Sequence, residues 1–231
     1  MKNKLDKKLI DDIIEWDVVN WSKSIVFWKR KIDLKDKNYS CLELGGRRGG
    51  LSLFLAENGN NVICSDLESP EEFASDLHKK YGYESRISYQ SIDATRIHYE
   101  NKFDIVTFKS VLGGISRNGN NKLKKITLDE IHKSLKPKGK LLFSENLEAS
   151  FIHKFFRKRF VTWGAEWNYL KYSEIEELFS SYSKLEYITV GFWGTFGRTE
   201  KQRKFLGRID NVFEKIVPKS KRYIVVGIAE K

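Results

Sequence analysis

The chain has few residues that could cross-link it or hold a metal ion: two cysteines and four histidines in 231 residues. Cys41 and Cys64 each lie in a segment that reads as a buried strand, so we expect free core thiols rather than a disulfide or a metal site. The histidines are scattered, and no metal-ligand cluster is predicted. The sequence also lacks a signal peptide and an apolar run long enough to span a membrane, which predicts a cytoplasmic protein.

Acidic residues are outnumbered by basic ones, which gives a net charge of +11 and a pI of about 9.4. Basic clusters occupy 154–159, 201–208 and 219–222. A basic surface favours anionic partners, although it also serves solubility alone. With 40% hydrophobic residues and no internal repeat, the composition is that of one ordinary domain with a substantial core.

The most informative segment runs from Cys41 to Ala56 and reads as a buried strand, an acidic residue, a glycine-rich turn and an apolar helix. Its candidate binding residues are Glu43, Gly45, Gly46 and Gly49. Glycine tolerates positive φ and lets a ligand approach the backbone, while the helix that follows aims unpaired N–H groups at the same place. Such turns also occur in proteins where nothing binds to them. The turn therefore predicts a binding site only together with the strands that follow it.

Four further strand-like segments follow, separated by helical ones, and two of them end in an acid. Val62–Asp66 ends in Asp66, about twenty residues beyond Glu43, where such folds place a carboxylate that accepts two ribose hydroxyls. Tyr89–Ala94 supplies a third short strand that ends in Asp93, and 103–108 and 140–144 continue the series. The pattern predicts a doubly wound α/β sheet that binds ligands at the carboxyl ends of its strands.

From residue 39 to 231 the chain resembles the class I S-adenosylmethionine-dependent methyltransferases. The family's acidic-x-Gly-x-Gly-x-Gly loop matches Glu43 to Gly49, with Arg47 where the middle glycine usually lies, and Lys136-Pro137-Lys138-Gly139 matches a turn common before the fifth strand. The resemblance implies a Rossmann-like sheet of about seven strands, mostly parallel with an antiparallel last strand and with helices on both faces. The segments 187–192 and 223–229 fit its closing pair.

The resemblance also implies the cofactor, S-adenosyl-L-methionine, with S-adenosyl-L-homocysteine as the product. In the family, the acid after the second strand holds the ribose and the one after the third meets the adenine amino group. These roles correspond to Asp66, beside Leu67, and Asp93, beside Ala94. Lys109, after the fourth strand, could lend its backbone carbonyl to the cofactor's ammonium or be a solvated strand end. Family members that use a divalent metal carry an acid in that region, so we expect no metal.

A nicotinamide dehydrogenase is the nearest rival for this turn, since Gly45-x-Arg47-x-x-Gly50 imitates the dinucleotide fingerprint. The replaced glycine counts against it, because that position lets the backbone approach a pyrophosphate.

Residues 1–38 are expected to form a helical cap on a methyltransferase domain at 39–231. Apolar residues recur at helical spacing from Leu5 to Ile14, and an aromatic stretch from Trp16 to Trp28 follows. These helices either pack their aromatics on the sheet or form a lid over the cofactor, with Trp21 as the predicted cofactor-facing residue.

The acceptor pocket is expected from an aromatic and basic insert at about 149–172. Glu145 and His153 are the titratable residues that topology places best to deprotonate a hydroxyl, although a histidine such as His153 is more often a surface residue on a basic helix. An Asn/Asp-Pro-Pro-aromatic motif is absent at Lys109. The family's methyltransferases for adenine or glutamine amines carry that motif, so oxygen or carbon acceptors are favoured.

The sequence therefore predicts a methyltransferase acting on a small or lipid-linked anionic acceptor, such as a sugar or another metabolite, with membrane-surface contact possible. An RNA methyltransferase that uses the basic face is the alternative. A third reading is a non-catalytic cofactor-binding partner of another protein.

Overall fold

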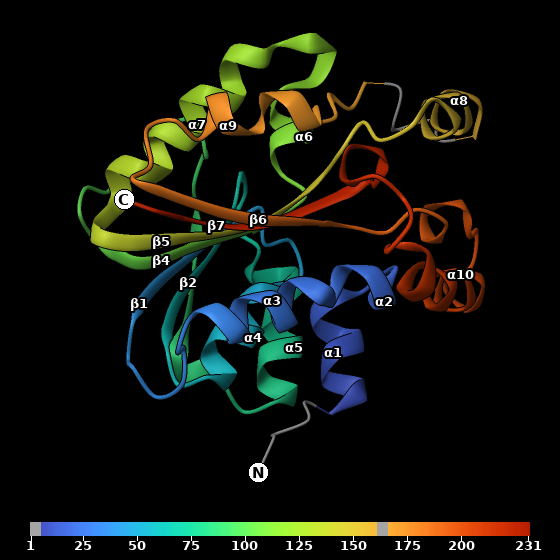
Figure 1. The fold of residues 1–231 in the computed structure, drawn as a ribbon. Coiled ribbons are helices and arrows are strands. Elements are labelled where there is room, and N and C mark those ends of the chain that lie inside the picture. Colours follow the sequence, from blue (N-terminus) through green and yellow to red (C-terminus); the bar gives the residue numbers. More distant parts are fainter. Residues whose placement is uncertain (1–5, 161–165) are drawn as a thin grey trace.

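The computed structural model describes residues 6–160 and 166–231. Within these residues, seven strands form one sheet in the order β3-β2-β1-β4-β5-β7-β6 (Figure 1). Every neighbouring pair is parallel except the two that involve β7, the last strand of the chain. The predicted Rossmann-like sheet is confirmed. The strands are β1 Ser40–Leu44, β2 Asn61–Asp66, β3 Ile87–Ser91, β4 Phe103–Lys109, β5 Leu135–Asn146, β6 Lys184–Val190 and β7 Ile224–Glu230.

Helices cover both faces of the sheet. One face carries α1 Lys7–Ile14, α2 Val18–Trp21, α3 Lys23–Lys31, α4 Gly50–Glu57 and α5 Glu71–Lys80, and the other carries α6 Leu112–Ile115, α7 Asn121–Ser134 and α9 Ile175–Leu178 (Figure 1). Two more helices, α8 Phe151–Phe160 and α10 Glu200–Phe213, lie beyond the carboxyl ends of β4 and β5. The 3-10 turns are η1 Glu84–Arg86, η2 Arg117–Gly119, η4 Tyr172–Glu174, η5 Gly194–Phe196 and η6 Lys219–Lys221.

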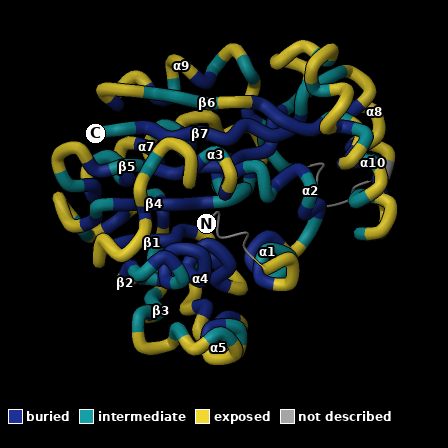
Figure 2. Tube along the Cα trace, turned by 60° about the horizontal axis from the view of Figure 1, so that its bottom comes forward, coloured by how far each residue is buried: buried dark blue, intermediate teal, exposed yellow. Residues whose placement is uncertain are grey.

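Alternation along the strands divides the core into two layers. Cys41, Ile105 and Leu142 belong to the layer beneath α1, α3 and α4, whereas their neighbours Leu42 and Val106 belong to the layer beneath α7 and α9. This is the period-2 arrangement of a sheet covered on both faces. Figure 2 shows the central strands β4 and β7 as largely buried. Cys41 and Cys64 are buried free thiols, as predicted.

Several boundaries differ from those expected. The predicted turn Lys136–Gly139 lies inside β5, at a register irregularity opposite Phe103 and Ile105, so the strand begins before it. The third strand ends at Ser91, and Asp93 lies in the loop after it. The segment between β6 and β7 holds η5, α10 and η6, where the sequence indicated only two closing strands.

Residues 7–31 form three helices that share the core of the sheet. Trp28 Nε1 donates a hydrogen bond to the carbonyl oxygen of Gly227 in β7 at 3.0 Å, and Trp21 and Trp28 are fully buried. The domain boundary predicted at residue 38 falls in the loop between α3 and β1. Across the described residues, no helix combines the length and the apolar character needed to cross a bilayer.

Candidate active site at the carboxyl end of the sheet

The glycine turn after β1 depends on left-handed backbone at three positions. Gly45 has φ +63°, Arg47 +42° and Gly49 +68°. A Cβ on Gly49 would lie only 2.4 Å from Nε2 of His78. Both the positive φ and the lack of space therefore require glycine at this position. Arg47 keeps the left-handed path that glycine usually takes in the family's loop, at a cost of about 1 to 2 kcal/mol. Arginine at position 47 therefore allows the turn to form but adds backbone strain to it.

Glu43 holds this turn against the start of α4. Its carboxylate accepts hydrogen bonds from the Leu51 N–H at 3.2 Å, from the Ser52 N–H at 2.7 Å and from the Ser52 hydroxyl at 2.5 Å. Burial raises the pKa of Glu43 to about 7, against these hydrogen bonds and the nearby Lys109, which favour the charged form. The residue thus caps the helix N-terminus beneath the turn.

The acid at the end of β2 is tied to the glycine turn and retains acceptor capacity. Asp66 accepts from the Arg47 N–H at 3.0 Å and from the Leu67 N–H at 2.8 Å, one bond to each oxygen. A carboxylate offers about four acceptor positions, so both oxygens can accept a further hydroxyl. Leu67 beside it is 70% exposed and offers an apolar surface.

Asp93 lies one strand further along the same edge. The Ile92 N–H donates to the Asp66 carbonyl oxygen at 2.8 Å, which joins the two acid-bearing loops. Asp93 is exposed and lines a cavity of about 560 Å³ together with Gln90, Ser91, Ile92, Arg96, His98 and Tyr99. Ala94 beside it is buried. The structure thus gathers the glycine turn, Asp66, Leu67, Asp93 and Ala94 at neighbouring strand ends.

The end of α1 closes over the glycine turn. A Cβ on Gly50 would lie 2.1 Å from the Ile13 carbonyl oxygen, and Arg48 pairs with Glu15 at 3.4 Å. Lys109 Nζ donates to the Ile14 carbonyl oxygen at 2.6 Å, and burial lowers the pKa of this lysine. The sequence left open whether Lys109 is a solvated strand end or lends its backbone carbonyl to the cofactor; its side chain is partly buried and bonded to α1, so it is not a solvated strand end. The contact of its side chain with a segment 95 residues away has no local signal.

Trp21 lies in the core and not on an open face, with no exposed surface. Its ring centroid is 5.3 Å from that of Trp16. Among the described residues, its buried Nε1 has no hydrogen-bond partner. An unsatisfied buried donor is uncommon and calls for an explanation, such as a ligand acceptor or a bound water.

Both predicted bases, Glu145 and His153, form hydrogen bonds with other groups of the protein. Glu145 is fully buried and accepts from the N–H groups of Val111, Leu112 and Asn146 at 2.7 to 2.8 Å. Burial raises its pKa to about 7. These bonds fix the loop after β4 to the end of β5.

His153 is also fully buried, among the rings of Phe192, Phe196 and Tyr223. Its Nε2 lies 2.9 Å from the Phe192 carbonyl oxygen, a geometry that assigns a donating Nε2–H, and its Nδ1 lies 2.7 Å from the Ser150 hydroxyl. Burial lowers the pKa of His153 to about 4. The imidazole is therefore neutral and holds α8 against the segment after β6.

The insert after β5 packs on the loop after β4. A Cβ on Gly113 would lie 1.9 Å from Nε1 of Trp167, so the indole occupies the space that a larger residue would fill. Arg157 lies 3.9 Å from the ring centroid of Tyr169 and donates to the Leu147 carbonyl oxygen at 2.7 Å. This arginine is buried and holds the insert together. Residues 161–165 of the predicted insert lie outside the described residues.

In the part of the chain that the structure describes, no group of three or more His, Cys, Asp and Glu side chains is placed to hold a metal ion. The expectation that no metal is used stays a prediction.

Comparisons with known proteins agree with this geometry. Residues 42–143 match the family model of a methyltransferase domain. The chain is similar to phosphoethanolamine N-methyltransferase 2 of Haemonchus contortus in complex with S-adenosyl-L-methionine, at 17% identity and a TM-score of 0.61. That match covers 91% of this chain and 52% of the nematode protein, so the chain spans about half its length.

Two other solved structures show the same fold. The YcgJ protein of Bacillus subtilis is 15% identical over 90% of this chain and 98% of its own, with a TM-score of 0.60. The [4+2]-cyclase SpnF is also 15% identical, over 90% of this chain and 79% of its own, with a TM-score of 0.60. Among curated protein sequences, none matches this chain.

The fold is that of a Rossmann-like domain, and the glycine turn, Asp66 and Asp93 lie at neighbouring strand ends of its sheet. The match to the methyltransferase domain family covers residues 42–143, from β1 to β5. The fold is the Rossmann-like fold of the similar solved structures, among them an N-methyltransferase in complex with S-adenosyl-L-methionine.

Proposed function

We propose that this chain transfers a methyl group from S-adenosylmethionine to a small or lipid-linked anionic acceptor, at an oxygen or carbon atom. The observation that carries the proposal is the gathering of the glycine turn, Asp66 and Asp93 at neighbouring strand ends. The loop after β4 connects this site to the aromatic insert, because Val111 packs on Gly45 and Gly113 packs on Trp167. The fold alone does not decide the reaction, because it also occurs in the cyclase SpnF.

The residues at the strand ends fit this cofactor. Asp66 has acceptor positions left for two ribose hydroxyls, exposed Leu67 can cover an adenine face, and Asp93 can accept from the exocyclic amine. Gly45 and Gly46 let the backbone approach the ligand. When bound, S-adenosylmethionine supplies an electrophilic methyl group on a sulfonium.

Catalysis by positioning suits the contacts around this site. Holding an acceptor in line at about 3 Å from the reacting carbon supplies several kcal/mol of barrier lowering. A base is needed only where the acceptor is a hydroxyl. Glu145 and His153 each bond to other protein groups, which supports a positioning role for both.

The anionic character of the acceptor is inferred from charge. The net charge is +11, and α8 of the insert carries the exposed Arg159 and the exposed Lys154, which pairs with Glu148 at 2.6 Å. An acidic acceptor would be drawn to this end of the sheet. RNA remains the runner-up, since a basic surface also attracts phosphates. The cytoplasmic location expected from the sequence stays a prediction.

Methyl incorporation tests the proposal. The purified chain is incubated with methyl-labelled S-adenosylmethionine and cell extract, which is then separated into water-soluble metabolites, lipids and RNA. We expect label in the first two fractions, and less of it with Asp66→Ala at a cofactor concentration near the dissociation constant of the wild type. Ribonuclease-sensitive label would favour the RNA methyltransferase. Cofactor binding without label in any fraction would favour the non-catalytic partner protein.

A further inference from the structure

Helix α10 presents an apolar and basic stripe that no other described element covers. Lys201, Phe205, Arg208 and Val212 follow one another at intervals of four, three and four residues, so they share one face of the helix. All four are exposed, Phe205 to 63% and Val212 to 65%. A single exposed apolar side chain is common on a protein surface, but several in one stripe are unusual.

The opposite face of α10 is the one that docks to the protein. A Cβ on Gly207 would lie 2.8 Å from Cβ of Val19 in α2. Asp210 accepts from Nδ2 of Asn20 at 2.8 Å and from the Trp193 N–H at 2.7 Å. The helix therefore already has its intramolecular partner, and the stripe faces away from it.

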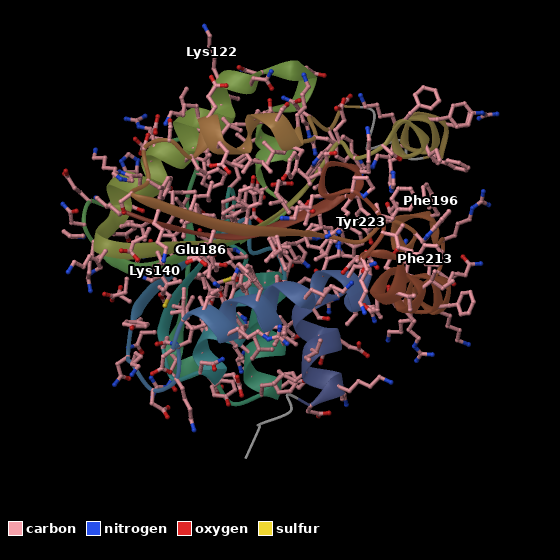
Figure 3. All side chains as sticks on the ribbon, viewed as in Figure 1. Lys122, Lys140, Glu186, Phe196, Phe213 and Tyr223 are labelled. Carbon is pink, nitrogen blue, oxygen red and sulfur yellow. The ribbon has the colours of Figure 1, made fainter. Side chains whose placement is uncertain are left out.

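Aromatic rings extend the stripe across to α8. Successive ring centroids lie 5.8 Å apart between Phe155 and Phe156, 5.2 Å between Phe156 and Phe196, 6.2 Å between Phe196 and Trp193, and 6.4 Å between Trp193 and Phe213. Phe196 and Phe213 are labelled in Figure 3, on the side of the molecule where Figure 1 shows α8 and α10 together. We call this surface the α8–α10 face. It consists of the rings of Phe155, Phe156, Trp193 and Phe196, and of the exposed side of α10 with the turn that follows it. The exposed side of α10 carries Lys201, Phe205, Arg208, Val212 and Phe213.

Basic side chains border the α8–α10 face. Lys215, Lys219 and Lys221 are exposed after α10, and among the described residues no carboxylate lies within ion-pair distance of them or of Lys201 and Arg208. Rings and aliphatic side chains interleaved with lysine and arginine are the composition of helices that lie in the interface of an anionic bilayer.

We propose that the α8–α10 face docks this protein on an anionic lipid membrane, with Phe205 and Val212 inserted at the level of the headgroups. Ile216, 76% exposed, adds a third apolar side chain just beyond the helix. Val212 and Ile216 have no ring to stack on a base, which favours lipid over single-stranded RNA. A two-fold contact through this face would bring Lys201 and Arg208 near their own copies, which opposes a homodimer.

Docking would place the active site beside the membrane. In Figure 1, α8 and α10 lie beyond the carboxyl ends of β4 and β5, the edge that also carries the candidate active site. A lipid-linked acceptor would then meet the site without leaving the bilayer surface. This consequence rests on the proposed function, whereas the docking itself does not.

Vesicle binding tests the docking with the full chain. We expect sedimentation with vesicles of phosphatidylcholine containing about 30% phosphatidylglycerol, and little with phosphatidylcholine alone. Phe205→Ser with Val212→Ser should lower the partition coefficient at least tenfold. Lys201→Glu with Arg208→Glu should lower it at least as far, because each basic residue near the surface contributes about fivefold.

Two matched variants control for general effects. Phe73→Ser removes a phenylalanine of α5 that is 66% exposed. Lys122→Glu reverses a charge on α7, far from α10 in Figure 3. Both should bind the anionic vesicles like the wild type.

Four results would overturn the docking: no binding to anionic vesicles; equal loss in the control variants; dissociation of a dimer by Phe205→Ser with Val212→Ser; or RNA binding through Lys201 and Arg208 without vesicle binding. Cofactor binding is measured by calorimetry on the same preparations. Failure on vesicles with intact cofactor binding would refute the docking alone, whereas loss of cofactor binding would refute the proposed function.

Discussion

Replacing Asp17 by asparagine should change how the stability of this protein depends on pH. Asp17 is fully buried between α2 and α10, where it accepts a hydrogen bond from the Tyr223 hydroxyl and lies near Asp210 and Glu200. Burial, with the two neighbouring carboxylates, raises its pKa from 3.8 to about 7. The folded protein therefore holds a proton that the unfolded chain releases.

This difference in proton binding sets the direction in which stability changes with pH. As pH rises from about 4 to 7, the unfolded state loses its proton first, so the wild type loses stability over that window. The whole shift, from 3.8 to about 7, is a ceiling of about 4 kcal/mol at about 1.4 kcal/mol per pKa unit. About 2 to 3 kcal/mol of it falls between pH 5 and pH 8.

Urea denaturation at pH 5 and pH 8 measures the effect. The free energy of unfolding of Asp17→Asn, minus that of the wild type, should increase by about 2 to 3 kcal/mol from pH 5 to pH 8. A constant offset from altered hydrogen bonds cancels in this comparison. Asp76→Asn, at an exposed aspartate of α5, should run parallel to the wild type. Parallel curves for Asp17→Asn would refute the reasoning.

Three further predictions concern the turn, the cap and the presumed base. Arg47→Gly should raise the free energy of unfolding by up to about 1 kcal/mol, because it relieves left-handed strain, whereas Arg48→Gly should lower it; the opposite order would contradict the turn geometry. Hydrogen exchange of residues 7–31 should slow when S-adenosylhomocysteine binds, since α1 closes over the turn, and unchanged exchange would refute a lid. Glu145→Gln should destabilise the protein by about 2 kcal/mol or more, while kcat of the folded enzyme stays within tenfold; a kcat loss above a hundredfold at unchanged stability would restore Glu145 as a base.

The sequence predicted the glycine turn and the acids near the ends of the second and third strands because their signals are local. Asp66 directly ends a run of apolar strand residues, and Gly45 and Gly49 adopt the positive φ that only glycine adopts without strain. Strand order follows from alternating strands and helices. These features need no knowledge of distant contacts.

The rest depends on contacts between residues far apart in the chain. Asn20 reaches Asp210 across 190 positions, and no local pattern in α10 indicates that its inner face docks on α2. The sequence predicts Glu145 just after the fifth strand, whereas it lies within the last residues of β5, and only the folded chain shows that its carboxylate accepts hydrogen bonds from the Val111 and Leu112 N–H groups. The burial of His153 could not be predicted for the same reason, because its partners Phe192 and Phe196 belong to the segment after β6.

Calorimetric titration with S-adenosylhomocysteine tests the central claim most directly. We expect micromolar binding by the wild type and a 5- to 150-fold weaker affinity for Asp66→Ala, because two hydroxyl hydrogen bonds to a charged acceptor, worth about 1 to 3 kcal/mol together, are lost. Asp76→Ala should bind like the wild type. No heat with S-adenosylhomocysteine or S-adenosylmethionine, alongside tight binding of NAD, would contradict the account.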